Sequence, residues 1–241
     1  MCLLDGLTPQ RAALLVIDMQ RDFLHPDGYA AQAGLDIAPL RAAIGPVGAV
    51  LDAARAAGML VIHTREGHLP DLSDCAPYKL DRSRKAGAEI GSKGPLGRLL
   101  VRGEFGHDFV DELRPAPGEI VIDKPGYSAF EHTTLQPLLT TRGIDTLVVT
   151  GITTEVCVSS TLRAAADRGY RCVTVRDACA SGDAALHEAA LRMVGVEGGV
   201  FGEVVSSAEV ISQLALQIST PNAKTQRTQR SQRKNMKDNE K

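Results

Sequence analysis

The chain has 241 residues and a formal net charge of -2, with 44% hydrophobic but only 4% aromatic residues. That length allows one large α/β domain or two small ones, and the hydrophobic fraction supports a sizeable core without metals or disulfides. Because Trp is absent and aromatic residues are few, we expect a core of Ala, Val, Leu and Ile, which suits buried parallel strands flanked by Ala-rich helices.

The charge is unevenly distributed along the chain. Residues 221–241 contain seven Lys or Arg against two acidic residues, a net charge of +5, which leaves -7 for residues 1–220. A nucleic-acid-binding core would have the opposite sign, so we expect no nucleic-acid partner. The tail lacks periodic apolar residues and repeats a Gln-Arg theme, which predicts a disordered solubilising or cloning-derived extension. A nucleic-acid-binding arm is the alternative.

The cysteines and the apolar runs predict the compartment. Five cysteines, an odd number with no CxxC pair, indicate free thiols rather than disulfides. No signal-peptide pattern precedes the first apolar run, and no apolar run approaches the length of a membrane span. We therefore expect a cytoplasmic protein without a membrane partner, since reducing compartments keep thiols free.

Short apolar runs alternate with helical patterns along the chain. The expected strands are residues 12–17, 59–63, 119–122, 146–150 and 171–175, with a weaker sixth at 199–205. Their continuous apolar character is typical of strands that are buried on both faces. The expected helices are residues 39–57, 131–141, 156–168 and 184–194, of which the first three end near a glycine.

This alternation predicts a three-layer α/β/α sandwich with a mostly parallel central sheet, built as one domain over residues 1–220. The long segment 65–103 is rich in Gly, Pro and charge, which predicts a lid or pocket wall. Ligands in such sheets bind beyond the carboxyl ends of the strands. The residues selected by this rule are Asp18, Thr64–Gly67, Asp123–Phe130, Gly151–Cys157 and Asp177.

Three of these strand ends carry side chains with complementary chemistry. Cys157 falls in the first turn of an expected helix, where the helix dipole and unpaired N–H groups favour a thiolate; the alternative is a small buried hydrophobic residue. Asp18 ends the first strand, where a carboxylate needs a partner; the alternative is a salt bridge or loop cap. Lys124 ends the third strand before a Pro-Gly turn; the alternative is a solvated loop lysine.

The three groups together predict nucleophilic catalysis. The first, third and fourth strands can lie near the centre of a doubly wound sheet, so that their ends converge on one crevice. There Asp18 would take the thiol proton, and Lys124 would stabilise the thiolate and hold the carboxylate. Backbone N–H groups near Cys157 would receive the developing oxyanion.

Three motifs carry a resemblance to a known family: LVIDMQRDF at 15–23, DKP at 123–125 and GITTEVCV at 151–158. With them, the chain resembles the isochorismatase-like cysteine hydrolases over about residues 12–207. The resemblance implies a triad of Asp18, Lys124 and Cys157, and a non-proline cis peptide between Ile152 and Thr153. It also implies that the oxyanion is held by the backbone N–H groups of Thr153 and Cys157. The nicotinamidase branch carries an Asp-x-His metal site that this chain lacks, so we expect no metal and no cofactor.

Further segments are most similar to biuret hydrolases within that family: HTREGH at 63–68, PDL at 70–72, GPLGR at 94–98, RGE at 102–104 and GGVFG at 198–202. The resemblance implies a substrate-contacting Lys at the position of Tyr127 and a substrate-binding Gln at the position of Glu197. This chain departs from biuret hydrolases at both positions. If both side chains face the pocket, a cation is lost and an anion gained, which favours a planar cation such as guanylurea. Drift at positions outside the pocket is the alternative. Phe23 and Arg65 complete the expected substrate-binding set.

The predicted function is a cysteine amidohydrolase that cleaves a terminal ureide C–N bond and releases ammonia. Guanylurea is the favoured small-molecule substrate, biuret or triuret the alternatives, and a homo-oligomer is expected. A nucleotide-binding oxidoreductase is disfavoured, because the first strand leads into Asp18-Met19-Gln20 and not into a glycine-rich phosphate turn. A catalytically silent binding protein on the same fold is disfavoured by the intact set of Asp18, Lys124 and Cys157.

Overall fold

The computed structural model describes residues 4–219, and the predicted basic tail at 221–241 lies outside the described residues. The strands are β1 (Ala12–Ile17), β2 (Leu60–Glu66), β3 (Lys93–Gly94), β4 (Gly97–Arg98), β5 (Ile120–Lys124), β6 (Thr146–Ile152), β7 (Arg171–Ala180) and β8 (Glu203–Val205). Six of them form one parallel sheet in the order β5-β2-β1-β6-β7-β8. The short strands β3 and β4 pair antiparallel in a separate ribbon.

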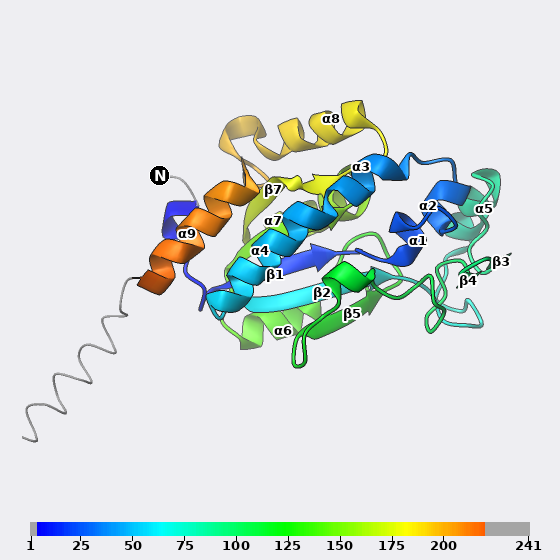
Figure 1. Ribbon diagram of the computed structural model, residues 1–241, viewed down its shortest axis with the longest axis horizontal. Helices are drawn as coiled ribbons and strands as arrows, with labels where there is room; N and C mark the ends of the chain where they lie inside the picture. The colour runs from blue at the N-terminus through cyan, green and yellow to red at the C-terminus, as the bar shows by residue number, and fades with distance from the viewer. Residues whose placement is uncertain (1–3, 220–241) are drawn as a thin grey trace, which may run out of the picture.

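Helices cover both faces of the sheet (Figure 1). They are α1 (Arg21–Leu24), α2 (Tyr29–Gln32), α3 (Ile37–Ala42), α4 (Ile44–Ala56), α5 (Pro77–Lys85), α6 (Leu135–Thr141), α7 (Ser159–Asp167), α8 (Ala184–Val194) and α9 (Ser207–Ser219). Short helical turns occur at Leu4–Gly6, Asp111–Leu113, Thr154–Val158 and Val196–Gly198. Helices α4 and α9 pack into one core and α6 and α7 into the other, which confirms the three-layer α/β/α sandwich with a parallel sheet.

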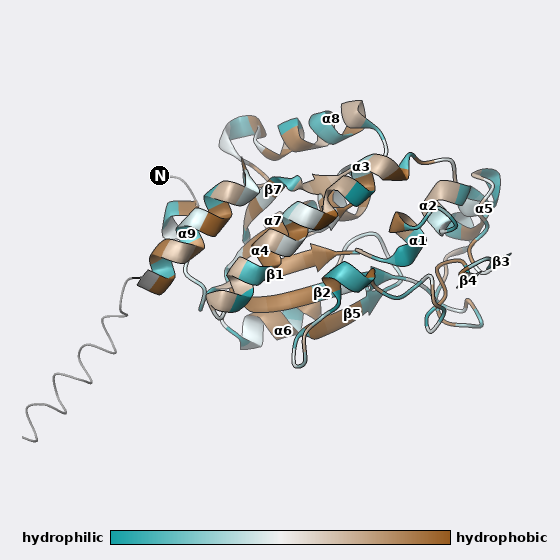
Figure 2. Ribbon diagram, viewed as in Figure 1, coloured by the Kyte–Doolittle hydropathy of each residue, from teal (hydrophilic) through white to brown (hydrophobic). Residues whose placement is uncertain are grey.

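Strand β1 shows why the apolar runs are continuous. All six of its residues are buried. Successive side chains of a strand point to opposite faces, so Leu14 and Val16 pack in the core with α4, whereas Leu15 and Ile17 pack in the opposite core. Figure 2 shows the central strands in brown and the outer helices in mixed colours. A strand covered on both faces has no polar side, as the sequence pattern predicted.

The element boundaries differ from prediction mainly where glycines or turns interrupt a pattern. β1 and α8 coincide with the predicted ranges, while β2 and β5 continue to Glu66 and Lys124. The predicted sixth strand shrinks to Glu203–Val205, because Gly199 and Gly202 adopt positive φ in the preceding turn. The predicted helix at 39–57 is two helices that meet at Ala43. The predicted helix at 156–168 begins as a π-helical turn at Thr154–Val158.

The predicted place of the third strand in the sheet was wrong. β5 forms an edge, and β2 lies between it and β1. Neighbouring strands are about 4.8 Å apart, so Lys124 at the end of β5 must reach across roughly 10 Å toward the end of β1. The long, unbranched lysine side chain makes that reach feasible.

Within residues 4–219, one stretch is long and apolar enough to cross a membrane by length and composition, Ile37–Ala56. By this criterion, the expectation that no apolar run approaches the length of a membrane span was wrong. In the structure the stretch forms α3 and α4, and Val47, Val50 and Leu51 of α4 are buried in the core. A core helix of this kind passes the same test, because its buried face raises the mean hydropathy.

We expect Gly151→Ala to destabilise the protein and to displace Asp18. Gly151 has φ +114°, and a Cβ there would lie 2.1 Å from the backbone oxygen of Ile17, the residue before Asp18. The clash and the positive φ should together lower the free energy of unfolding by about 2–4 kcal/mol. Urea unfolding followed by circular dichroism measures this loss.

The matched control is Gly48→Ala in α4, where the new Cβ would make an ordinary 3.6 Å contact with Leu113. Alanine is the better helix former, so this variant should be neutral or more stable by up to about 1 kcal/mol. Equal unfolding midpoints for Gly151→Ala and the unmodified protein would contradict the predicted close approach of β6 to β1.

Candidate active site

Asp18 is placed by a sharp change of backbone direction at the end of β1. Its φ is +54°, in the left-handed region that residues other than glycine adopt uncommonly. Its backbone N–H donates to the carbonyl of Thr64 at 3.1 Å, and the Thr64 hydroxyl donates to Asp18 Oδ1 at 2.6 Å. The carboxylate is fully buried, and these two hydrogen bonds hold Asp18 against the neighbouring strand β2.

Lys124 carries a cation into the same buried space. Its Nζ lies 2.7 Å from Asp18 Oδ2, 3.5 Å from Cys157 Sγ and 3.6 Å from Glu66 Oε2. It also donates to the carbonyl of Gly126 at 3.1 Å. Burial alone would lower the pKa of Lys124, but the surrounding acidic groups, Asp18 foremost, raise it above its ordinary value. The side chain is thus a permanent cation.

Cys157 lies in the π-helical turn at Thr154–Val158 that follows β6. The peptide bond between Ile152 and Thr153 is cis, which confirms the prediction from the family resemblance. Burial raises the pKa of the Cys157 thiol well above its ordinary value; Lys124 opposes this, while Glu66 and Asp18 add to it. The helical turn was expected to favour a thiolate, but burial and the hydrogen bond from Sγ to Glu66 both favour the neutral thiol.

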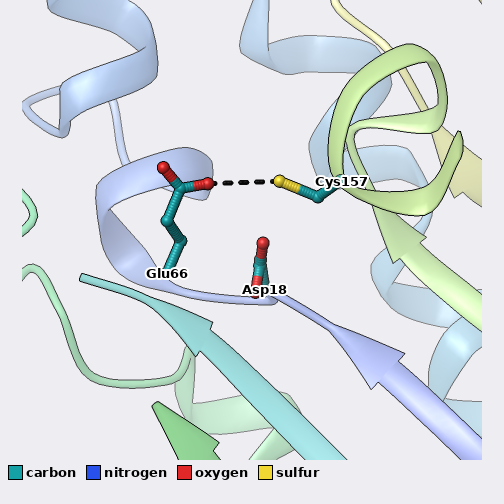
Figure 3. A group of neighbouring side chains, drawn as sticks. All are labelled: Asp18, Glu66 and Cys157. Carbon is teal, nitrogen blue, oxygen red and sulfur yellow. Dashed lines mark hydrogen bonds between the residues drawn. The ribbon is translucent and has the colours of Figure 1, made fainter. Parts of the chain in front are cut away.

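Glu66, the last residue of β2, is the principal site residue that the sequence reasoning did not single out (Figure 3). The Cys157 thiol donates to Glu66 Oε2 at 3.2 Å. The other carboxylate oxygen, Oε1, lies 2.6 Å from Nζ of Lys79, a residue of α5 that also donates to the carbonyl of Pro125 at 2.7 Å. The strand-end rule had selected the range that contains Glu66 without choosing among its members.

Gln20 fixes the backbone of Glu66. Its side-chain amide oxygen accepts from the Glu66 N–H at 2.7 Å, and its Nε2 donates to the Glu66 carbonyl at 3.0 Å. The same Nε2 donates to the carbonyl of His107 at 2.9 Å. Gln20 is completely buried, so these bonds satisfy a polar group that would otherwise be costly to bury.

The two carboxylates beside the thiol differ in proton affinity. Burial raises the pKa of Asp18, and the opposing effect of Lys124 does not cancel this rise. Burial alone would raise the pKa of Glu66 as well, yet Lys79 and Lys124 lower it to about 2. When the surroundings push the pKa values of two neighbouring carboxyl groups apart, the one with the higher pKa can exchange a proton and the other stays ionised. Asp18 therefore fits the role of proton carrier, and Glu66 remains an anion.

A metal does not fit this cluster. Asp18, Glu66 and Cys157 form the one group of three candidate metal ligands within residues 4–219, with ligand atoms within 4.8 Å of one another. The Lys124 ammonium lies against all three groups, so the cation that their charge calls for is supplied by the protein. His63 and His68 are engaged elsewhere, with Glu119 at 2.8 Å and Asp74 at 3.2 Å.

The thiol opens onto a cavity of about 710 Å³. Its lining includes Glu66, Thr153 and Cys157 and, as expected from the sequence, Phe23 and Tyr127. Thr153 and Cys157, whose backbone N–H groups were expected to hold an oxyanion, thus both border the space where a substrate would lie. A second cavity, of about 600 Å³, lies near the amino ends of the strands, beside Met59 and Ile144, and its lining contains none of the three triad residues.

Two expected substrate contacts lie outside this lining in the single chain. Arg65 pairs with Asp123 at 2.7 Å and Asp108 at 3.2 Å. Glu197 is exposed in the turn Val196–Gly198, where its φ is +51°. Their predicted contact with substrate stays a prediction, and the acidic group that does border the thiol is Glu66.

Comparison with known proteins identifies the family of this chain. Residues 12–209 match the family profile described as Isochorismatase domain. A cysteine hydrolase from Pseudomonas syringae pv. phaseolicola is 28% identical over 88% of this chain and 95% of that chain, with a TM-score of 0.74. An isochorismatase family protein from Desulfovibrio vulgaris is 31% identical over 85% and 98%, with a TM-score of 0.70. N-carbamoylsarcosine amidase from Thermoplasma acidophilum is 28% identical over 82% and 96%, with a TM-score of 0.62.

We expect chelation to leave the enzyme's activity unchanged. The position that a divalent ion would take among Asp18, Glu66 and Cys157 is filled by the Lys124 ammonium, so bound metal would have to displace a buried ion pair. The measurement is ammonia release from a ureide before and after exhaustive dialysis against EDTA and phenanthroline, with metal content determined in parallel. Loss of activity that a divalent ion restores would contradict this prediction.

Proposed function

This chain belongs to the isochorismatase-like family of cysteine hydrolases, and we propose that it is an amidohydrolase that cleaves a C–N bond of a small, nitrogen-rich ureide and releases ammonia. The observation that carries the proposal is the buried set of Asp18, Lys124 and Cys157, of which Cys157 lines a cavity. Such a set supplies a nucleophile, a proton carrier and a fixed cation. Similarity to an enzyme named as an N-carbamoylsarcosine amidase, a C–N hydrolase by that name, supports the reaction class.

The proposed reaction proceeds in two halves. Cys157 Sγ forms a bond to the ureide carbonyl carbon while its proton passes to Asp18, and the carbonyl oxygen becomes an oxyanion bound by the N–H groups of Thr153 and Cys157. Asp18 then gives that proton to the departing nitrogen as the C–N bond breaks and ammonia leaves. Water attacks the resulting thioester, the C–S bond breaks, and a water proton restores the thiol.

The charge of the cavity supports a cationic or neutral substrate. Its lining contains four carboxylates against one guanidinium: Asp36, Glu66, Glu155 and Asp183, with Arg82. An anionic ligand such as a carbamoyl amino acid would meet repulsion there, whereas N–H donors would gain charge-assisted hydrogen bonds. Guanylurea, a planar cation, is the substrate we favour, with biuret or triuret as the neutral alternatives. The preference for a cation thus rests on the cavity acids rather than on Glu197.

Two rival functions make different predictions. A nucleotide-binding oxidoreductase would need a phosphate cradle after β1, where this chain instead places the buried Asp18 and Gln20. A silent binding protein would hold the same small molecule without turning it over. Turnover itself separates the second rival from an enzyme.

A substrate panel tests the proposed function. We expect ammonia release to be fastest with guanylurea, slower with biuret and triuret, and slowest with N-carbamoylsarcosine, because the last carries a carboxylate into an acidic cavity. Cys157→Ala should abolish release from every substrate while the circular dichroism spectrum is retained. Turnover of the carboxylate alone, or ammonia release by Cys157→Ala, would contradict the proposal.

Substitution of two glutamates identifies the group that selects the substrate. We expect Glu155→Gln to lower the guanylurea-to-biuret ratio of kcat/KM roughly tenfold (about 1.4 kcal/mol), because Glu155 lines the cavity two residues before the nucleophile. The exposed Glu197 should leave the ratio unchanged when replaced by Gln. A reversed result would return the selection to Glu197, as the sequence pattern first indicated.

A further inference from the structure

The resting thiol is directed at the carboxylate that is less able to take its proton. Cys157 Sγ donates to Glu66 Oε2 at 3.2 Å (Figure 3). Asp18, the carboxylate with the raised pKa, is occupied by Lys124 at 2.7 Å and by the Thr64 hydroxyl at 2.6 Å. A hydrogen bond donated to a permanent anion stabilises the S–H form. Glu66 thus keeps the nucleophile protonated in the free enzyme.

Glu66 is also within reach of a ligand. It lines the same cavity as Cys157 and Thr153, and its Oε2 lies 3.2 Å from the sulfur that must reach the ureide carbonyl. Its other oxygen, Oε1, is fixed at 2.6 Å from Lys79, whose Nζ is anchored to the Pro125 carbonyl. One oxygen is therefore immobile, and the other can exchange the thiol for a different donor.

We propose, on the basis of the function proposed above, that Glu66 is a catalytic residue with two successive partners, first the Cys157 thiol and then an N–H group of the bound ureide. In the free enzyme Oε2 accepts the S–H bond. On binding, an N–H of the substrate displaces that bond, and the thiol turns toward Asp18. Its proton then passes to Asp18 as Sγ forms the bond to the carbonyl carbon, so that the negative charge of Asp18 is replaced by that of the oxyanion and the total charge is unchanged.

This exchange makes an N–H donor next to the scissile carbonyl part of the activation step. Ureides carry such donors on both sides of the carbonyl. A ligand without one, such as an ester or a tetra-alkylated urea, would leave the thiol on Glu66 and therefore protonated. The site thus selects its substrate class by releasing the nucleophile only to molecules that can replace the thiol as donor.

The test measures two reactivities of the Glu66→Gln variant that should change in opposite directions. Removing the anion beside the thiol lowers its pKa, and iodoacetamide reacts with thiolates, so we expect alkylation of Cys157 at neutral pH to be about tenfold faster or more, with the pH profile shifted to lower pH. Ammonia release from the best ureide should fall at least about a hundredfold in kcat/KM, because the substrate loses a charged acceptor. Site-resolved mass spectrometry follows the alkylation.

Other roles for Glu66 give different results. If Glu66 were the general base, Glu66→Gln would slow alkylation together with turnover. If Glu66 only supported the fold, both rates would fall and the pH profile of alkylation would stay in place. Either result overturns the inference. The matched control is Glu112→Gln, a change at an exposed residue outside the cavity lining, which should alter neither rate.

Two further variants guard against a folding defect. Glu66→Gln leaves Lys79 unpaired, so the double variant with Lys79→Met removes both charges of the buried pair at similar volume and should also alkylate faster. Lys79→Met alone leaves Glu66 without its partner and should slow alkylation, because the anion beside the thiol is less neutralised. Alkylation that does not differ between these two variants would overturn the inference.

Failure of the proposed function would look different. In that case the unmodified protein would release no ammonia from any ureide, and Cys157 would show no alkylation that a substrate slows. If the unmodified protein turns over a ureide while Glu66→Gln loses alkylation and turnover together, the proposed function stands and only the role of Glu66 is overturned.

Discussion

A lysine ammonium with no exposed surface is the interaction on which the rest of the site depends. Lys124 Nζ lies within 3.6 Å of Asp18, Glu66 and Cys157. A buried cation is tolerated only with opposite charge and hydrogen bonds around it, and buried carboxylates need the same from a cation. Removing Lys124, Asp18 or Glu66 would leave an uncompensated buried charge, so the arrangement is mutually enforced. The nucleophile is held in an electrostatic framework that exists before any substrate binds.

The parallel sheet makes that framework geometrically possible. The carboxyl ends of β1, β2, β5 and β6 meet at one edge and deliver Asp18, Glu66, Lys124 and the turn that carries Cys157. Two backbone features bring the groups close: the positive φ of Asp18 and the absence of a Cβ at Gly151, which lets β6 approach β1. Helix α5 contributes Lys79, which contacts Glu66 at the end of β2 and Pro125 directly after β5.

Much of this could be predicted from the sequence, because continuous apolar runs identify buried strands and the strand-end rule identifies the residues that follow them. Strand order could not be predicted, because strand pairing depends on long-range packing that the periodicity of the sequence does not record. β5 lies at the edge of the sheet and not near its centre. Lys79 lies in α5, a short helix inside the segment 65–103, for which the sequence predicted a lid or pocket wall but no helix. Glu66 was within reach of the alternation rule, since on β2 it shares a side with Thr64, whereas Arg65 points the other way and pairs with Asp123.

The two acids beside the thiol are suited to different tasks, because one can transfer a proton and the other keeps its negative charge. Asp18 and Glu66 both lie against Lys124, yet only Glu66 has a second cation, Lys79, and its pKa falls to about 2, whereas burial raises the pKa of Asp18. A single carboxylate could not both carry a proton during the reaction and stay ionised to accept substrate N–H groups. Placing the second lysine on a helix outside the sheet assigns the two tasks to different residues.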